Sequence, residues 1–328
     1  MLLDKRHTYK PFKYPFAYEA WEQHERMHWM GAEVPMAEDV HDWKNNITTQ
    51  QREFLTQIFR FFTTADVCVG SAYNTKFLPL FAGNPEVAMM MSSISARESI
   101  HVQGYALLID TVGMPETEYS SFLEYKAMKD KYDFLENVDT STHFNVAKAL
   151  AIYPGFTEGV QLFATFAMLI HFERMGLMKG MSNIIRWSLR DEDLHSNCML
   201  KLYNVFKQEY IDPVEVPMLE SQILSVAETM VDLEDKFIDL SFGVLSEDDL
   251  NKFLPEGEDR LCKDKLKQYI RHMTDYRLKQ MGIKPIYGID KTPLPWLDRL
   301  LLAPEHTNFF EARPTEYSKG GLKGAIEY

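Results

Sequence analysis

The sequence contains few cysteines, and they are too scattered to organise a fold. It has three in 328 residues: Cys68, Cys198 and Cys262. A disulfide framework or a structural zinc site needs more cysteines at closer, paired spacing. Both are therefore excluded, and we expect a reduced, cytoplasmic protein.

Clustered basic residues and long apolar runs are also missing. The chain has 35 Lys and Arg against 48 Asp and Glu, a formal charge of −13, and no basic cluster suited to a phosphate backbone. The longest apolar run near the middle, residues 159–170, contains Gln161 and Thr165 and is too short to span a bilayer. The first ten residues lack the apolar core of a secretory signal. We expect neither a nucleic-acid surface nor a membrane segment.

Sustained β-type alternation and Asn-Gly hairpin signals are absent as well, whereas helical apolar spacing recurs throughout the chain. Thr48 followed by Gln51 predicts a capping box, and Asn84-Pro85 opens a helix that Gly113 closes. Further helices are expected at about 115–136, 144–180 with an interruption at Pro154-Gly155, 182–210, 217–243 and 258–281.

The distribution of proline and glycine divides this all-α chain into three parts. Residues 1–46 contain three prolines and are expected to form an arm with at most short helices. Residues 47–282 are expected to form one helical domain. Residues 283–328 are expected to form a C-terminal segment ending in a mobile tail.

Four Glu-x-x-His pairs occur, and their context separates them. Glu25–His28 and Glu38–His41 lie in the proline-bearing arm. Glu98–His101 and Glu192–His195 lie within long apolar helices, where a spacing of three residues places both side chains on one helix face. Taken alone, either pair could instead face solvent. If the pairs are buried, an unpaired carboxylate costs several kcal/mol, so they need partners.

A repeat supplies those partners. Asp66 precedes Glu98 by 32 residues, and Glu158 precedes Glu192 by 34, each acid lying in an apolar helix. Either spacing suits one helix, a turn and an antiparallel neighbour, so four helices would bring four carboxylates and two imidazoles together. Two divalent cations would balance that charge. This is the ligand pattern of ferritin-like bundles with a dinuclear site, and mixed oxygen and imidazole ligands suit iron or manganese.

Tyr105 lies one turn beyond His101 on the same helix face. One interpretation is a packed core tyrosine. The other is a buried phenol close enough to an oxidised metal pair to lose its hydrogen atom, with the surrounding apolar residues protecting the radical.

Together these motifs resemble the small (β) subunit of class I ribonucleotide reductase over essentially the whole chain. The resemblance rests on Glu158 and on four segments: "ADVCVGSAYNTKFLPL" around Asp66, "ESIHVQGY", "IIRWSLRDEDLH" and the tail "TEYSKGG". It implies that the metal ligands are Asp66, Glu98, His101, Glu158, Glu192 and His195.

The resemblance also implies a radical route. Tyr105 matches the position of the stable tyrosyl radical, and Asp191 matches an aspartate that hydrogen-bonds a ligand histidine, expected to be His101. Trp29 matches the tryptophan that begins the electron route, and Tyr317 matches a tail tyrosine that relays oxidising equivalents, with Tyr328 as its rival.

The implied activity is ribonucleoside-diphosphate reduction carried out with a separate large subunit. O2 would oxidise the metals and Tyr105, and the radical would then pass to a large-subunit cysteine. The tail is expected to dock on that subunit, and the chain to be a homodimer. Asp66 and Tyr105 favour a di-iron site; a dimanganese or mixed manganese–iron pair stays open.

Three alternatives also stay open. The first is a metal-only radical subunit with a dimanganese pair and no stable tyrosyl radical. The second is a ferritin-like di-metal oxidase or hydroxylase that acts directly on a small or lipid substrate. The third is metal storage in a ferritin-like shell, which predicts many iron atoms per chain and no persistent radical.

Overall fold

The long helices of the computed structural model begin where the local signals predict. Thr48 Oγ1 accepts from the backbone N–H of Gln51 while Gln51 Oε1 accepts from that of Thr48, so the predicted capping box starts helix α3. Helix α5 starts at Pro85 and ends before Gly113, whose φ of 72° is left-handed. Asn84 is the N-cap residue of α5, but its side chain makes no cap hydrogen bond. It donates to the carbonyls of Leu2 and Asp4, which ties the N-terminal segment to this end of α5.

The structure describes residues 1–115, 117–118, 129–130, 133, 139–246 and 261–302, without the side chains of 62–66 and 302. Most of these residues are helical and none of them is in a strand, so the all-α prediction is confirmed. Most of the expected helix 115–136 and the tail 303–328 lie outside them. The elements are α1 (Pro15–Arg26), η1 (Gly31–Glu33), α2 (Ala37–His41), η2 (Asp42–Asn46), α3 (Thr49–Ala72), η3 (Tyr73–Phe77), α4 (Leu78–Phe81), α5 (Pro85–Val112), α8 (His143–Ile152), η5 (Tyr153–Gln161), α9 (Leu162–Arg174), α10 (Lys179–Tyr210), α11 (Val216–Phe242), α13 (Lys263–Gln280) and α14 (Pro295–Leu302).

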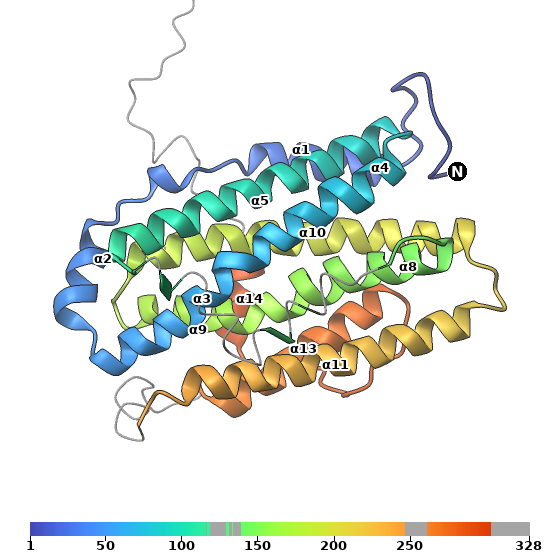
Figure 1. Cartoon of the computed structure of the whole chain (residues 1–328). Coiled ribbons are helices and arrows are strands. Elements are labelled where there is room, and N and C mark those ends of the chain that lie inside the picture. Colours follow the sequence, from blue (N-terminus) through green and yellow to red (C-terminus); the bar gives the residue numbers. More distant parts are fainter. Residues whose placement is uncertain (116, 119–128, 131–132, 134–138, 247–260, 303–328) are drawn as a thin grey trace, which may run out of the picture.

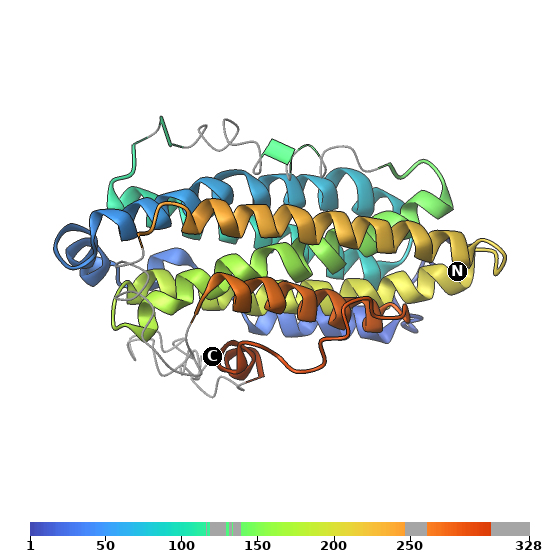
Figure 2. The ribbon, with the colours of Figure 1, turned by 90° about the horizontal axis from the view of Figure 1, so that it is seen from below.

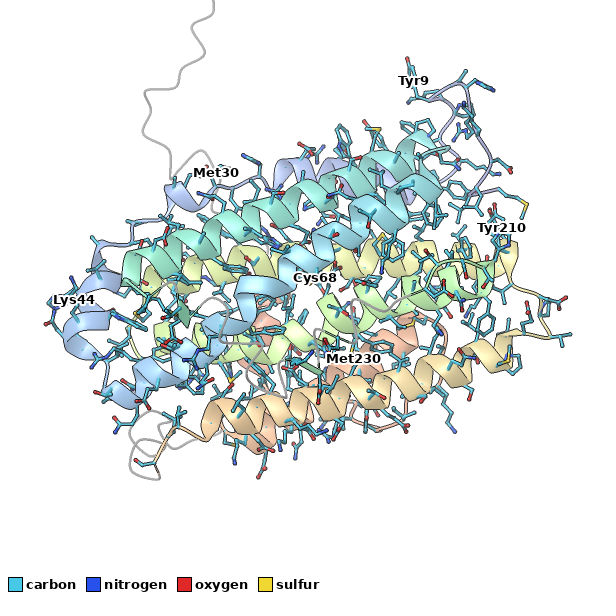
Figure 3. All side chains as sticks on the ribbon, in the orientation of Figure 1. Tyr9, Met30, Lys44, Cys68, Tyr210 and Met230 are labelled. Atoms are coloured by element: carbon cyan, nitrogen blue, oxygen red, sulfur yellow. The ribbon has the colours of Figure 1, made fainter. Side chains whose placement is uncertain are left out.

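The helices lie side by side along one long axis (Figure 1). α5 packs against α3 and α1, and α10 packs against the continuous run α8–η5–α9. Seen after a quarter turn, α11 and α13 lie next to each other on one face of the bundle (Figure 2). Side chains fill the space between the helices (Figure 3), and every residue of η5 is buried. The centre of the molecule is therefore the run that carries Glu158.

The first 46 residues contribute to this core. α1 buries Ala17, Ala20 and His24 against α5 and α10, and Trp29 follows with only 2% of its surface exposed. The expected interruption at Pro154-Gly155 is a nine-residue π-helix, η5, which joins α8 to α9 without a break. None of the described helices is both long enough and apolar enough to cross a membrane.

Candidate metal centre

Neighbouring helices bring the predicted ligands together. Glu98 and His101 share a face of α5, and Glu192 and His195 share a face of α10. Glu158 joins them from η5. All five side chains are buried, with at most 2% exposed. The sixth predicted ligand, Asp66, is on α3, and its side chain lies outside the described residues.

The charged atoms of this group lie within a few ångströms of one another. Glu98, Glu158, Glu192 and His195 each offer an atom within 4.8 Å of the other three. His195 Nδ1 lies 3.1 Å from Glu98 Oε1, and His101 Nδ1 lies 3.1 Å from Glu192 Oε1. Both imidazoles therefore turn Nδ1 towards the carboxylates.

Six atoms of this cluster have no hydrogen-bond partner among the described residues, although buried polar groups normally have one. They are both oxygens of Glu98, one each of Glu158 and Glu192, and Nδ1 of His101 and of His195. Each unsatisfied buried group costs about 1–3 kcal/mol, more when charged. Bound cations satisfy such atoms, and carboxylate and imidazole donors suit iron or manganese. The residues present thus fit a metal site.

The pKa values show how unfavourable this buried charge is when no cation is bound. Burial, and then the charge of Glu192, raises the pKa of Glu158 well above its usual range. Burial alone would lower the pKa of His195, but Glu192 and Glu98 outweigh it and raise that pKa to about 10. Burial likewise opposes ionisation of Glu98, yet His101 and His195 lower its pKa to about 2. Without metal, the cluster therefore holds protons that a cation would displace.

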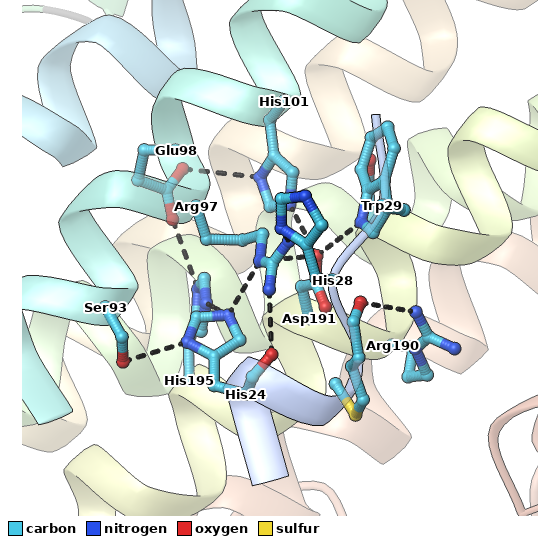
Figure 4. A network of polar contacts seen from close by, with 12 residues as sticks. His24, His28, Trp29, Ser93, Arg97, Glu98, His101, Arg190, Asp191 and His195 are labelled. Atoms are coloured by element: carbon cyan, nitrogen blue, oxygen red, sulfur yellow. Dashed lines mark hydrogen bonds and ion pairs between the residues drawn. The ribbon is translucent and has the colours of Figure 1, made fainter. Parts of the chain in front are cut away.

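A hydrogen-bonded chain leads outward from His101 (Figure 4). His101 Nε2 donates to Asp191 Oδ2 at 3.2 Å, and Trp29 Nε1 donates to the same oxygen at 2.8 Å. Arg97 Nε lies 3.5 Å from that oxygen. Although burial opposes it, the bond from His101 and the charge of Arg97 lower the pKa of Asp191 to about 2, so Asp191 is an ion that fixes the His101 ring.

Contacts with other helices hold the π-helix that carries Glu158. Tyr73 donates to Glu158 Oε2 at 3.0 Å. Ser196 donates to the carbonyl of Pro154 at 2.6 Å, and the buried Arg277 donates to that of Gly159 at 3.3 Å. A carbonyl in a π-helix pairs with the N–H five residues on instead of four, and here two of these carbonyls also accept from side chains of α10 and α13.

The predicted radical residues are placed as follows. Tyr105 is buried, with its ring centre 6.3 Å from that of His101. The Trp29 ring stacks on His101, with centres 5.9 Å apart, and packs on Cα of Gly104, where a Cβ would approach it to 3.2 Å. The two tail tyrosines at 317 and 328 lie outside the described residues.

Two residues near the site carry no sequence signal. His24 lies 3.2 Å from His195 through their Nε2 atoms, and Arg97 contacts both His24 and Asp191. His24 belongs to the proline-bearing arm, outside any predicted motif, and Arg97 reads as an ordinary helix residue next to Glu98. The packing of α1 on α5 and α10 brings His24 to the site, and the packing of α5 on α10 brings Arg97 to Asp191.

A bundle of long helices with buried carboxylates and imidazoles at its centre defines a ferritin-like, metal-binding protein. Comparison with known proteins narrows this class. The sequence profile of the family "Ribonucleotide reductase, small chain" matches residues 6–293. The chain is 42% identical to the "Probable ribonucleoside-diphosphate reductase small subunit 376L" of Invertebrate iridescent virus 6, over 98% of this chain and 97% of that protein.

More distant relatives agree. The chain is 28% identical to "Ribonucleoside-diphosphate reductase subunit beta" of Chlamydia pneumoniae, over 95% of this chain and 90% of that one. A solved structure, "Ribonucleotide reductase R2 subunit from Clostridium botulinum", superposes with a TM-score of 0.77 at 21% identity, covering 90% of this chain and 91% of that one. The chain belongs to the small-subunit family of ribonucleotide reductase, whose members work with a large subunit.

Proposed function

We propose that this small subunit generates a tyrosyl radical on Tyr105, stores it, and passes it to the large subunit for ribonucleotide reduction. The supporting observation is the hydrogen-bonded chain Trp29–Asp191–His101, which runs from a predicted ligand to a tryptophan on the far side of that ligand from the carboxylates. Core packing alone would not require a buried, ionised Asp191 that accepts hydrogen bonds from both Trp29 and the predicted ligand His101.

Six residues are proposed to hold two metal ions: Asp66, Glu98, His101, Glu158, Glu192 and His195. When bound, two irons supply one-electron oxidising chemistry driven by O2; manganese is the alternative. The burial of Tyr105 excludes water from its phenol, which favours a long-lived radical. Asp191 accepts hydrogen bonds from His101 and Trp29 at one oxygen, so a proton shift there can accompany electron transfer through Trp29.

The remaining steps involve the tail and the partner. We propose that the tail docks on the large subunit, that Tyr317 relays the radical there, with Tyr328 as the alternative, and that the chain acts as a cytoplasmic homodimer.

Electron paramagnetic resonance of iron-loaded, O2-exposed protein tests the radical. Wild type should show an organic radical, and Tyr105→Phe should lose it while metal analysis still finds two ions per chain. An unchanged radical in Tyr105→Phe would disprove the assignment, and no radical in wild type would favour the metal-only alternative.

Tyr317→Phe should keep the radical and lose turnover with the large subunit. Normal turnover in that variant would shift the relay role to Tyr328, for which Tyr328→Phe is the matched test.

A further inference from the structure

His195 has an outer partner of a different kind from that of His101. The partner is His24, near the end of α1, with 2% of its surface exposed (Figure 4). The two Nε2 atoms lie 3.2 Å apart. One of the two must carry the proton between them, and the geometry around His24 decides which.

Arg97 sets the direction of this hydrogen bond. Its Nε lies 3.2 Å from His24 Nε2, and a guanidinium can only donate. His24 Nε2 is therefore an acceptor and carries no hydrogen, so the proton of the pair is on His195 Nε2. The hydrogen of neutral His24 is then on Nδ1, which lies 3.1 Å from Ser93 Oγ. Ser93 is free to accept because its own hydrogen goes to the carbonyl of Met90 at 2.9 Å.

The same assignment makes Nδ1 the nitrogen of His195 that faces Glu98 and Glu192, at 3.1 and 3.4 Å, so a bound cation would displace the proton from Nδ1 and use its lone pair. That is the tautomer and ring orientation a metal ligand needs. We propose that His24 is a positioning residue for His195: as a neutral acceptor oriented by Arg97, it fixes which nitrogen of His195 faces the metal site. This rests on the proposed role of His195 as a ligand.

The two predicted ligand histidines are consequently unequal. His101 donates to an ionised carboxylate, which makes its Nδ1 a stronger electron donor, whereas His195 donates to a neutral imidazole that also accepts from a cation. The metal ion next to His195 should therefore be bound more weakly than the ion next to His101. Arg97 Nε lies 3.5 Å from Asp191 Oδ2 and 3.2 Å from His24 Nε2. Arg97 therefore contacts the hydrogen-bond partners of both predicted ligand histidines.

The test is an anaerobic Mn²⁺ titration of the full-length chain, with free Mn²⁺ counted by electron paramagnetic resonance. Wild type should bind two ions. His24→Leu keeps the bulk of the side chain but removes the hydrogen-bond acceptor. It should lower the affinity for the more weakly bound ion, next to His195, by about 10- to 100-fold and leave the affinity for the other ion unchanged. His24→Gln restores an acceptor oxygen and should bind both ions as wild type does. His171→Leu, a buried histidine of α9 roughly 20 Å along the run from Glu158, is the matched control and should bind both ions normally.

Each outcome decides the matter. Wild-type binding by His24→Leu overturns the proposal, and so does equal loss in the Gln and Leu variants, because an acceptor alone should suffice. If wild type itself does not bind two ions, the proposed two-ion site fails and this inference fails with it. If His24→Leu does not fold, nitrogen NMR of Zn²⁺-loaded wild type labelled with ¹⁵N-histidine decides. One proton coupled to two imidazole nitrogens supports the His195–His24 bond, and a proton on His24 Nε2 alone excludes it.

Discussion

Replacing Glu86 by glutamine should loosen the N-terminal segment that carries His24 and Trp29. Glu86, in the first turn of α5, is fully buried. Its Oε1 accepts from Arg6 Nη1 at 2.7 Å and from the backbone N–H groups of Lys13 and Tyr14 at 2.7 and 3.0 Å. This carboxylate therefore fastens the chain just before α1.

Glutamine keeps an oxygen but loses the charge that strengthens these three bonds. Charge-assisted hydrogen bonds contribute about 1.5–3 kcal/mol against about 0.5–1.5 for neutral ones, so the loss is about 1 kcal/mol each, or about 3 in total. At about 2.1 cal/mol/K per residue, a 328-residue chain should then unfold about 4 °C lower.

The pH dependence gives an independent check. Burial alone would raise the pKa of Glu86, but the backbone hydrogen bonds and Arg6 outweigh it and lower that pKa below the ordinary 4.5. A carboxyl with a lowered folded-state pKa stabilises fully above the unfolded-state value, and the contribution disappears as pH falls through the folded-state value. The difference between wild type and Glu86→Gln should be full above about pH 5.5 and should shrink below 4.5.

Urea unfolding of metal-free protein measures this difference across pH 7 to 4. The matched control is Glu22→Gln, an exposed residue of α1 paired with Arg26, which should change stability by no more than about 0.5 kcal/mol. Equal stability of wild type and Glu86→Gln at pH 7, or a difference that does not depend on pH, would refute the reasoning.

Two further predictions concern the metal cluster. In Gly159→Ala the new Cβ would lie 2.6 Å from Arg277 Nε and 2.8 Å from the Pro154 carbonyl oxygen. This overpacking should cost about 1–3 kcal/mol of stability, shift η5 and weaken Mn²⁺ binding at Glu158. Wild-type stability and Mn²⁺ binding in this variant would contradict the prediction. Metal binding at pH 7 should release protons, because the raised pKa values of Glu158 and His195 leave protons on the metal-free cluster. Calorimetry in two buffers of different ionisation enthalpy measures the release; identical heats would refute it.

The sequence could predict the parts of the site that one helix determines. Glu98 with His101, and Glu192 with His195, each share a face because they are three residues apart, and this follows from helix periodicity alone. The helix starts at Thr48 and Pro85 were readable for the same local reason. Glu158 could be paired with these motifs through its spacing.

What could not be predicted depends on distant packing. The π-helix around Glu158 reads in the sequence as a break at Pro154-Gly155, because the side chains of α10 and α13 that bind its carbonyls are remote in the sequence. His24 reaches His195 only when α1 docks on α5 and α10, and Arg97 reaches Asp191 only when α5 packs on α10. No local pattern encodes which remote side chain fills such a place.

The docking of α1 also sets an order of events during synthesis. Trp29 meets a partner 162 residues later in the chain, and His24 one 171 residues later. At about 5–20 residues per second, a ribosome needs on the order of ten seconds or more to add that stretch. During that interval the early helix has no docking surface on α10, and joining ends so far apart carries the entropic cost of a long loop. The complete pocket can therefore form only after more than half of the polypeptide has been made, so full metal loading follows translation of α10.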